Sequence, residues 1–179
     1  NDQDRLVRLM TVRALGAAFP HLTDMETAWN DLRKLTEDDD SGVRCSSYHS
    51  LGKISIFKAT ESDDEFRTHL EEAIEFFRRS SEEAEYFNPA AFCLPFYRSL
   101  YSLLFTEVPR EDEVQKYLVD AKEALEAIGA SESGEVLLEA VNNLSKALQE
   151  VRTYSIYDIL FRKQDLKSYT KYCLQTAEC

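Results

Sequence analysis

The amino-acid sequence predicts an all-α protein in which antiparallel helical hairpins stack as an α-α superhelix of about seven to nine helices. Apolar residues recur at helical spacing along almost the whole chain of 179 residues. Its five glycines and four prolines are too few for an all-β chain, which needs a turn about every ten residues. The connections between the periodic segments are short, so consecutive helices should pack side by side as antiparallel hairpins.

The first predicted hairpin joins helices at residues 5–18 and 24–35. The first of these helices stops ahead of Pro20, because proline cannot continue a helix. The second should begin at Thr23 or Asp24, since the side-chain oxygen of either residue can accept a hydrogen bond from a free N–H group of the first turn.

The second predicted hairpin joins helices at residues 43–58 and 64–79. The acidic run 37–40 and Gly42 interrupt the helical pattern before it and should form the turn between the hairpins. Trp29, the only tryptophan, lies on the apolar stripe of the preceding helix and is expected in the core. The last helix of this hairpin has a clean apolar face. That face consists of Phe66, Leu70, Ile74 and Phe77.

Further helices are predicted after residue 80. Asn88-Pro89 is a good start for a helix at about 89–105, because asparagine caps a helix and proline tolerates its first position. Pro95 should kink or restart that helix. The others are predicted at 111–128, capped by Gly129, at 134–153, and at 156–177, the last interrupted near Asp165.

An internal repeat relates the first two hairpins. A carboxylate ahead of each first helix can cap its N–H groups, and a glycine without a Cβ lets a neighbouring helix approach closely. A period of this length is typical of stacked helical hairpins. Shifting the sequence by 36 residues superposes Asp4 on Asp40, Val7-Arg8 on Val43-Arg44, and Leu15-Gly16 on Leu51-Gly52.

These residues resemble HEAT repeats of the short bacterial and archaeal kind, whose first helix reads Val-Arg-x-x-Ala-x-x-Ala-Leu-Gly. Here the motif stands as Val7-Arg8-Leu9-Met10-Thr11-Val12-Arg13-Ala14-Leu15-Gly16, and more loosely at residues 43–52, which depart from it at their small positions. The similarity covers about residues 4–80, as two repeats.

The resemblance implies a protein-binding scaffold, often one part of a larger regulatory protein, here of an archaeal repeat type. We expect residues 1–80 to form the two HEAT-like hairpins. Residues 81–179 lack the signature and should form a helical extension packed on them as one continuous all-α unit. The chain begins at Asn1 without a methionine and ends inside a predicted helix, so we expect it to be a piece of such a protein.

The charge of the chain bears on its partners. The formal net charge is −12, which argues against nucleic acid, because binding to nucleic acid depends on lysine and arginine neutralising phosphates. Residues 111–150 hold ten acidic and three basic residues; a solvated outer face explains them, and a docking surface for a basic partner is the alternative. One basic cluster, at the ends of the second helices, is the feature that keeps nucleic-acid binding as an alternative. It consists of Arg33, Lys34, Arg78 and Arg79.

The four cysteines are scattered, which favours reduced thiols in the cytoplasm over a disulfide framework. We expect Cys45 and Cys93 to be small core residues. No apolar run approaches the roughly 18 residues that a membrane span needs, and no signal-peptide pattern is present.

No catalytic, cofactor or metal-binding pattern is evident, so we expect no enzyme activity. The deoxyhypusine hydroxylase branch of HEAT-like proteins holds iron with His-Glu pairs, which His21, His49 and His69 do not form. Cys45 and His49 lie four residues apart on one helix face and could in principle activate a thiolate, but no third group accompanies them.

Residues 86–105 hold seven of the twenty aromatic residues of the chain. One interpretation is a core that joins the HEAT-like half to the C-terminal helices. The other is a groove beside Pro95 that receives an apolar peptide or a small ligand, with Arg98 holding an anionic group. The candidate binding residues are Phe92, Phe96, Tyr97, Arg98 and Tyr101.

We therefore expect a non-enzymatic scaffold that binds another protein or another part of its parent chain. The alternative is a small-ligand or peptide sensor that uses residues 86–105. The first helix should present Leu6, Leu9 and Met10 to a preceding repeat, so we also expect either self-association through this end or an exposed apolar patch there.

Overall fold

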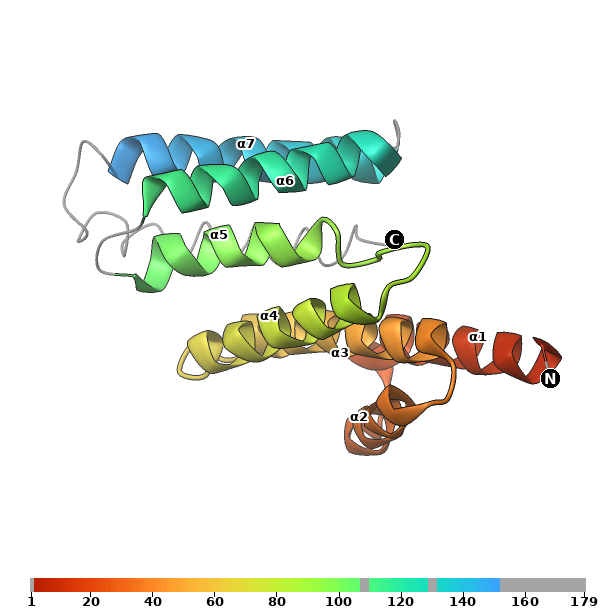
Figure 1. Cartoon of the computed structure of the whole chain (residues 1–179). Coiled ribbons are helices and arrows are strands. Elements are labelled where there is room, and N and C mark those ends of the chain that lie inside the picture. The colour runs from red at the N-terminus through yellow and green to blue at the C-terminus, as the bar shows by residue number, and fades with distance from the viewer. Residues whose placement is uncertain (1, 107–109, 129–131, 152–179) are drawn as a thin grey trace. The chain divides into compact units, whose positions relative to one another are not determined.

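The computed structural model describes residues 2–106, 110–128 and 132–151, and these residues form seven α-helices with two short 3-10 helices and no strand (Figure 1). The all-α class is therefore confirmed. The predicted helix at 156–177 and the predicted cap at Gly129 lie outside the described residues. The helices are α1 (Asp2–Ala18), η1 (Phe19–His21), α2 (Met25–Lys34), η2 (Leu35–Glu37), α3 (Ser41–Glu61), α4 (Phe66–Glu83), α5 (Cys93–Phe105), α6 (Glu111–Ile128) and α7 (Glu132–Val151).

The chain divides into two compact units, Asn1–Ala90 and Ala91–Cys179. The first contains α1 to α4 and the second α5 to α7. The division falls at Ala90 rather than at residue 80, because the segment after α4 is bonded to the first unit. The Ser41 hydroxyl donates a hydrogen bond to Glu85 at 2.8 Å. Packing of residues 81–179 on the first part as one continuous unit stays a prediction.

Two of the predicted N-terminal helix caps, Asp24 and Asp40, are confirmed, and two are wrong, Asp4 and Asn88, since α5 begins at Cys93. Asp24 is the N-cap of α2, and Asp40 is the N-cap of α3, where its carboxylate accepts a hydrogen bond from the Val43 N–H at 3.0 Å. Asp4 is not a cap, because α1 already begins at Asp2. Its carboxylate lies in the first turn, where the positive end of the helix dipole still favours it.

The glycines of the repeat permit close packing, as predicted. α3 packs against both α1 and α4. A Cβ at Gly16 would lie 2.9 Å from the Cβ of Ser50 on α3, and a Cβ at Gly52 would lie 2.6 Å from the ring of Phe77 on α4. Real Cβ atoms essentially never come within 3.0 Å of a neighbour. The two helices related by the 36-residue shift, α1 and α3, are therefore neighbours.

The core of the first unit joins α1, α2 and α3. The apolar face predicted for α4 is confirmed at Leu70 and Phe77, which are fully buried. Trp29, expected in the core, is half-buried and packs against the core at its edge, and the Lys58 ammonium lies over its ring, 3.5 Å from the ring centre. The buried core residues are Val12, Phe19, Ala28, Leu32, Val43, Leu51 and Ile54.

In the second unit α5, α6 and α7 pack against one another. α5 begins at Cys93 rather than at residue 89, and Pro95 lies in its first turn, where the missing N–H removes no hydrogen bond of the helix. The predicted restart therefore corresponds to the start of the helix itself. The predicted apolar stripes of α6 and α7 are confirmed. Val114, Leu118, Ala121, Leu125, Leu137, Val141, Leu144 and Leu148 are all 6% exposed or less.

Candidate interaction surfaces

The aromatic region predicted as a core or a groove is divided by the structure. Tyr86 and Phe87 lie in the loop after α4 and are 99% and 69% exposed. Phe92, Phe96 and Tyr97 are buried. The rings of Phe92 and Phe96 stack at 5.1 Å, and Phe96 meets Tyr97 edge to face at 5.1 Å. Three of the five candidate binding residues are thus buried, and a core that joins the two halves of the chain stays a prediction, as does the groove.

The other two candidates, Arg98 and Tyr101, are half-buried and engaged within the second unit. The Arg98 guanidinium lies 5.8 Å from the ring centre of Tyr117 on α6, a cation-π distance. The Tyr117 hydroxyl donates to Glu113 at 2.6 Å. Burial, followed by this bond, raises the pKa of Tyr117. Arg98 therefore joins α5 to α6.

The surroundings of the Cys45–His49 pair on α3 disfavour an activated thiol. Cys45 is buried, and its sulfur lies 3.5 Å from the Ser80 hydroxyl. Burial raises the pKa of the Cys45 thiol and lowers the pKa of His49 to about 3. These shifts disfavour the thiolate–imidazolium state that nucleophilic catalysis requires. Cys93, expected as a core residue, is half-buried.

The basic cluster at the ends of the second helices is balanced by carboxylates. Lys34 pairs with Asp31 at 2.8 Å on α2, and on α4 Arg78 and Arg79 pair with Glu75 at 2.6 Å and 2.9 Å. The hydrogen bond from Arg78, with that from Arg79, lowers the pKa of Glu75 to about 2. These three cations therefore bind the carboxylates of their own helices.

The arginine of each Val-Arg motif has a role that the sequence analysis missed. Arg8 on α1 pairs with Asp38 just after η2, at 2.7 Å. Arg44 on α3 pairs with Glu83 at the end of α4, also at 2.7 Å. Each arginine thus joins the first helix of its hairpin to the end of the second. The acidic residues at or just after the end of each second helix were the available signal.

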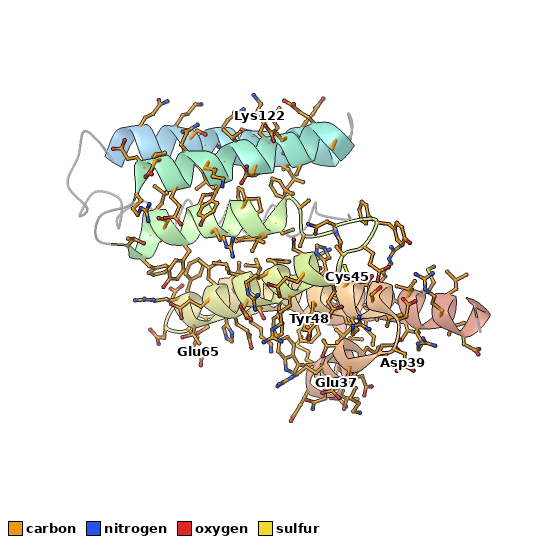
Figure 2. All side chains as sticks on the ribbon, in the orientation of Figure 1. Glu37, Asp39, Cys45, Tyr48, Glu65 and Lys122 are labelled. Carbon is orange, nitrogen blue, oxygen red and sulfur yellow. The ribbon has the colours of Figure 1, made fainter. Side chains whose placement is uncertain are left out.

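Another ion pair joins the first hairpin to the second. The Arg5 guanidinium of α1 donates to Asp40 at 2.6 Å, and Asp40 also caps α3. The nearby exposed members of the acidic run, Glu37 and Asp39, are labelled in Figure 2.

The outward face of α1 is apolar and exposed. Leu6, Val7 and Met10 are 59%, 61% and 58% exposed, and Ala14 and Ala17 on the same side are also exposed. At 100° per residue these five positions fall within about 100° of arc. We call them the α1 stripe. The predicted exposed patch is therefore present, although Leu9, which we expected in it, packs against the core instead.

The acidic outer face of α6 and α7 is confirmed as solvent-exposed. Lys122, labelled in Figure 2, is one of the few basic residues on it. The predicted exposed carboxylates are Glu111, Glu123, Glu126, Glu135 and Glu139.

No described helix is long and apolar enough to cross a membrane. No three histidine, cysteine, aspartate or glutamate side chains in this part of the chain are grouped to hold a metal ion. No protein-family model, curated protein or solved structure matches the chain.

Proposed function

We propose that this chain is a non-enzymatic scaffold that binds another protein through the α1 stripe. The observation that carries the proposal is that three large apolar side chains, Leu6, Val7 and Met10, are each more than half exposed on one side of a helix. On the opposite side of the same helix Val12 is fully buried, and Leu9 and Leu15 pack against the core. A contiguous exposed apolar stripe on a folded unit is typical of a protein-binding surface.

We also propose that the first unit is a pair of stacked HEAT-type hairpins. The close approach of Gly16 to Ser50 supports a stack of the first helices. The second helices touch as well, since the rings of Trp29 on α2 and Phe76 on α4 meet edge to face at 5.8 Å. Tyr48 on α3 lies 6.4 Å from the same Phe76 ring, among the side chains that crowd between α3 and α2 (Figure 2).

The absence of enzymatic activity is part of the proposal, supported by the opposed pKa shifts of Cys45 and His49. A cytoplasmic location rests on the scattered cysteines. A ligand sensor built on residues 86–105 has less support, because three of its five candidate residues are buried.

The test compares proteins captured from a native lysate of the source cells by the unmodified chain and by two variants. Met10→Glu places a charge in the α1 stripe. Val119→Glu makes the same kind of change at a 43% exposed position on α6, outside the stripe. We expect at least one captured protein to fall about tenfold with Met10→Glu, as for a central interface residue, and to remain with Val119→Glu. Capture that is identical for all three chains would refute the proposal.

A further inference from the structure

The loop between α4 and α5 presents two aromatic side chains to solvent. Tyr86 is 99% exposed and Phe87 is 69% exposed, and we call these two residues the loop pair. They are the only exposed aromatic residues in the part of the chain that the structure describes. Neither ring contacts another ring or a cation among the described residues. Because large aromatic side chains contribute strongly to binding once a partner covers them, the loop pair is a candidate binding surface.

The residues on both sides of the loop pair are anchored to the first unit. Before the pair, the Glu85 carboxylate accepts a hydrogen bond from the Ser41 hydroxyl at 2.8 Å. After the pair, the Asn88 amide donates to the Ser81 hydroxyl at 2.9 Å, and its oxygen accepts a bond from the Ala90 N–H at 2.9 Å. Because these flanking residues are already held, a partner that covers the two rings orders less of the chain, which lowers the entropic cost of binding.

Two exposed carboxylates near the loop pair form no ion pair within the described residues. One is Glu85, which directly precedes the pair. The other is Asp39, which lies two residues before Ser41, the residue to which Glu85 is bonded. Arg44, in the first turn of α3, is paired with Glu83 at 2.7 Å, so its charge is already balanced. The surface around the loop pair therefore carries negative charge that no neighbouring cation compensates.

Two other tyrosines of this chain show what completes such a surface. The Arg79 guanidinium lies 6.0 Å from the ring centre of Tyr48. The Arg98 guanidinium lies 5.8 Å from the ring centre of Tyr117, whose hydroxyl is bonded to a carboxylate at 2.6 Å. A guanidinium over a ring gains from the negative face of the aromatic system, and a nearby carboxylate adds to the attraction. The loop pair has the rings and the carboxylates but lacks the cation.

We propose that the loop pair, with the carboxylates of Glu85 and Asp39, binds an arginine-rich segment of another protein. The guanidinium planes stack on the exposed rings, and their N–H groups donate to the carboxylates. Arginine fits this surface better than lysine, because its planar group can stack and can donate two parallel hydrogen bonds at once. Charge complementarity selects a basic occupant. The residues involved are not those of the α1 stripe, so this inference goes beyond the proposed function and does not depend on it.

The test titrates a fluorescein-labelled synthetic peptide of alternating arginine and glycine with the full chain at low salt, followed by fluorescence anisotropy. Tyr86→Leu and Phe87→Leu together keep the net charge and leave apolar side chains, but they remove both ring faces. We expect this double variant to bind the peptide about 5- to 30-fold more weakly, as for two exposed cation-π contacts. Both positions are exposed, so its urea midpoint of unfolding should not change. Equal binding by the double variant and the unmodified chain would show non-specific attraction to an acidic protein and would overturn the proposal.

A second pair of variants tests the carboxylates. Glu85→Gln removes a charge beside the loop pair while its side-chain oxygen can still accept the Ser41 bond, and it should weaken peptide binding. Glu139→Gln removes the same charge at an exposed position of α7 and should weaken binding less; equal losses would overturn the proposal.

Three further measurements distinguish other occupants of the loop pair. A peptide of alternating lysine and glycine that binds as tightly as the arginine peptide would overturn the stacking of guanidinium groups. Cosedimentation with phosphatidylcholine vesicles that the double leucine variant loses would show that a lipid surface covers the rings. A dimer of the unmodified chain that the same variant dissociates would show that a second copy covers them. Either of these last two results would also overturn the arginine-rich segment as the occupant.

Discussion

His49 should make the first unit sensitive to acid at pH values where the carboxylates are still ionised. The imidazole is 8% exposed, and its ring centre lies 5.6 Å from that of Phe77 on α4. Its Nδ1 has no hydrogen-bond partner among the described residues. Burial, and then the positive charges of Lys53 and Arg13, lower the pKa of His49 from 6.5 to about 3.

The sign follows from proton binding. Between pH 6.5 and about 3 the unfolded chain binds a proton at His49 that the folded chain does not, so the free energy of unfolding falls as the pH falls. The slope reaches about 1.4 kcal/mol per pH unit, which gives a loss of about 2 kcal/mol between pH 7 and pH 5. The carboxylates with lowered pKa values act at lower pH, because their ordinary values are 3.8 for Asp24, Asp38 and Asp40 and 4.5 for Glu75.

Urea unfolding at about pH 7, 6 and 5, followed by the fluorescence of Trp29, measures this effect in the first unit. His49→Leu should remove most of the pH dependence over this range, whatever it does to the stability at pH 7. His21→Leu, at an exposed histidine of η1, is the matched control and should leave the slope in place. If His49→Leu shows the same loss between pH 7 and pH 5 as the unmodified chain, the reasoning is wrong.

Three further predictions concern packing and capping. Gly16→Ala should lower the free energy of unfolding by about 1–2 kcal/mol, which is the cost of overpacking less the gain in helix propensity. Adding Ser50→Gly should restore the stability. Additive effects of the two substitutions in a double-mutant cycle would contradict the contact. Asp40→Ala should lower the free energy of unfolding by about 1 kcal/mol through loss of the α3 cap. Asp39→Ala, at an exposed neighbour, should lower it little, and thermal unfolding of both variants measures the difference. Phe77→Ala should lower the free energy of unfolding by about 3–5 kcal/mol. Phe87 is 69% exposed, so Phe87→Ala should change it by no more than about 0.5 kcal/mol. Equal effects of the two substitutions in urea titrations would refute the burial assignment.

The sequence predicted features that depend on a single residue type at a fixed spacing. Gly16 and Gly52 could be assigned to close helix contacts because only the absence of a Cβ explains a glycine inside a helical pattern. Asp40 was predictable as a cap because a turn signal precedes it. Asp4 has the same spacing, but α1 starts earlier, and no residue before it marks that start.

Features that depend on the tertiary environment could not be predicted in the same way. α5 is apolar on several sides, so its periodicity does not distinguish a buried Phe96 from an exposed one. The burial of His49 follows from the approach of Phe77, which is distant in the sequence. The α1 stripe was predictable in part, because Leu6 and Met10 share a face, but the inward position of Leu9 depends on how α1 rotates against the core.

The ion pairs that close each hairpin have a consequence for the order of folding. Arg8 and Asp38 are separated by 30 residues, and Arg44 and Glu83 by 39. Closing loops of this length costs little more entropy than closing shorter ones, and helical proteins with local contacts fold quickly. The residues of the first hairpin are therefore complete once Asp38 is made, but its packing is completed only by α3, which supplies Val43, Leu51 and Ile54 to the core of the first unit.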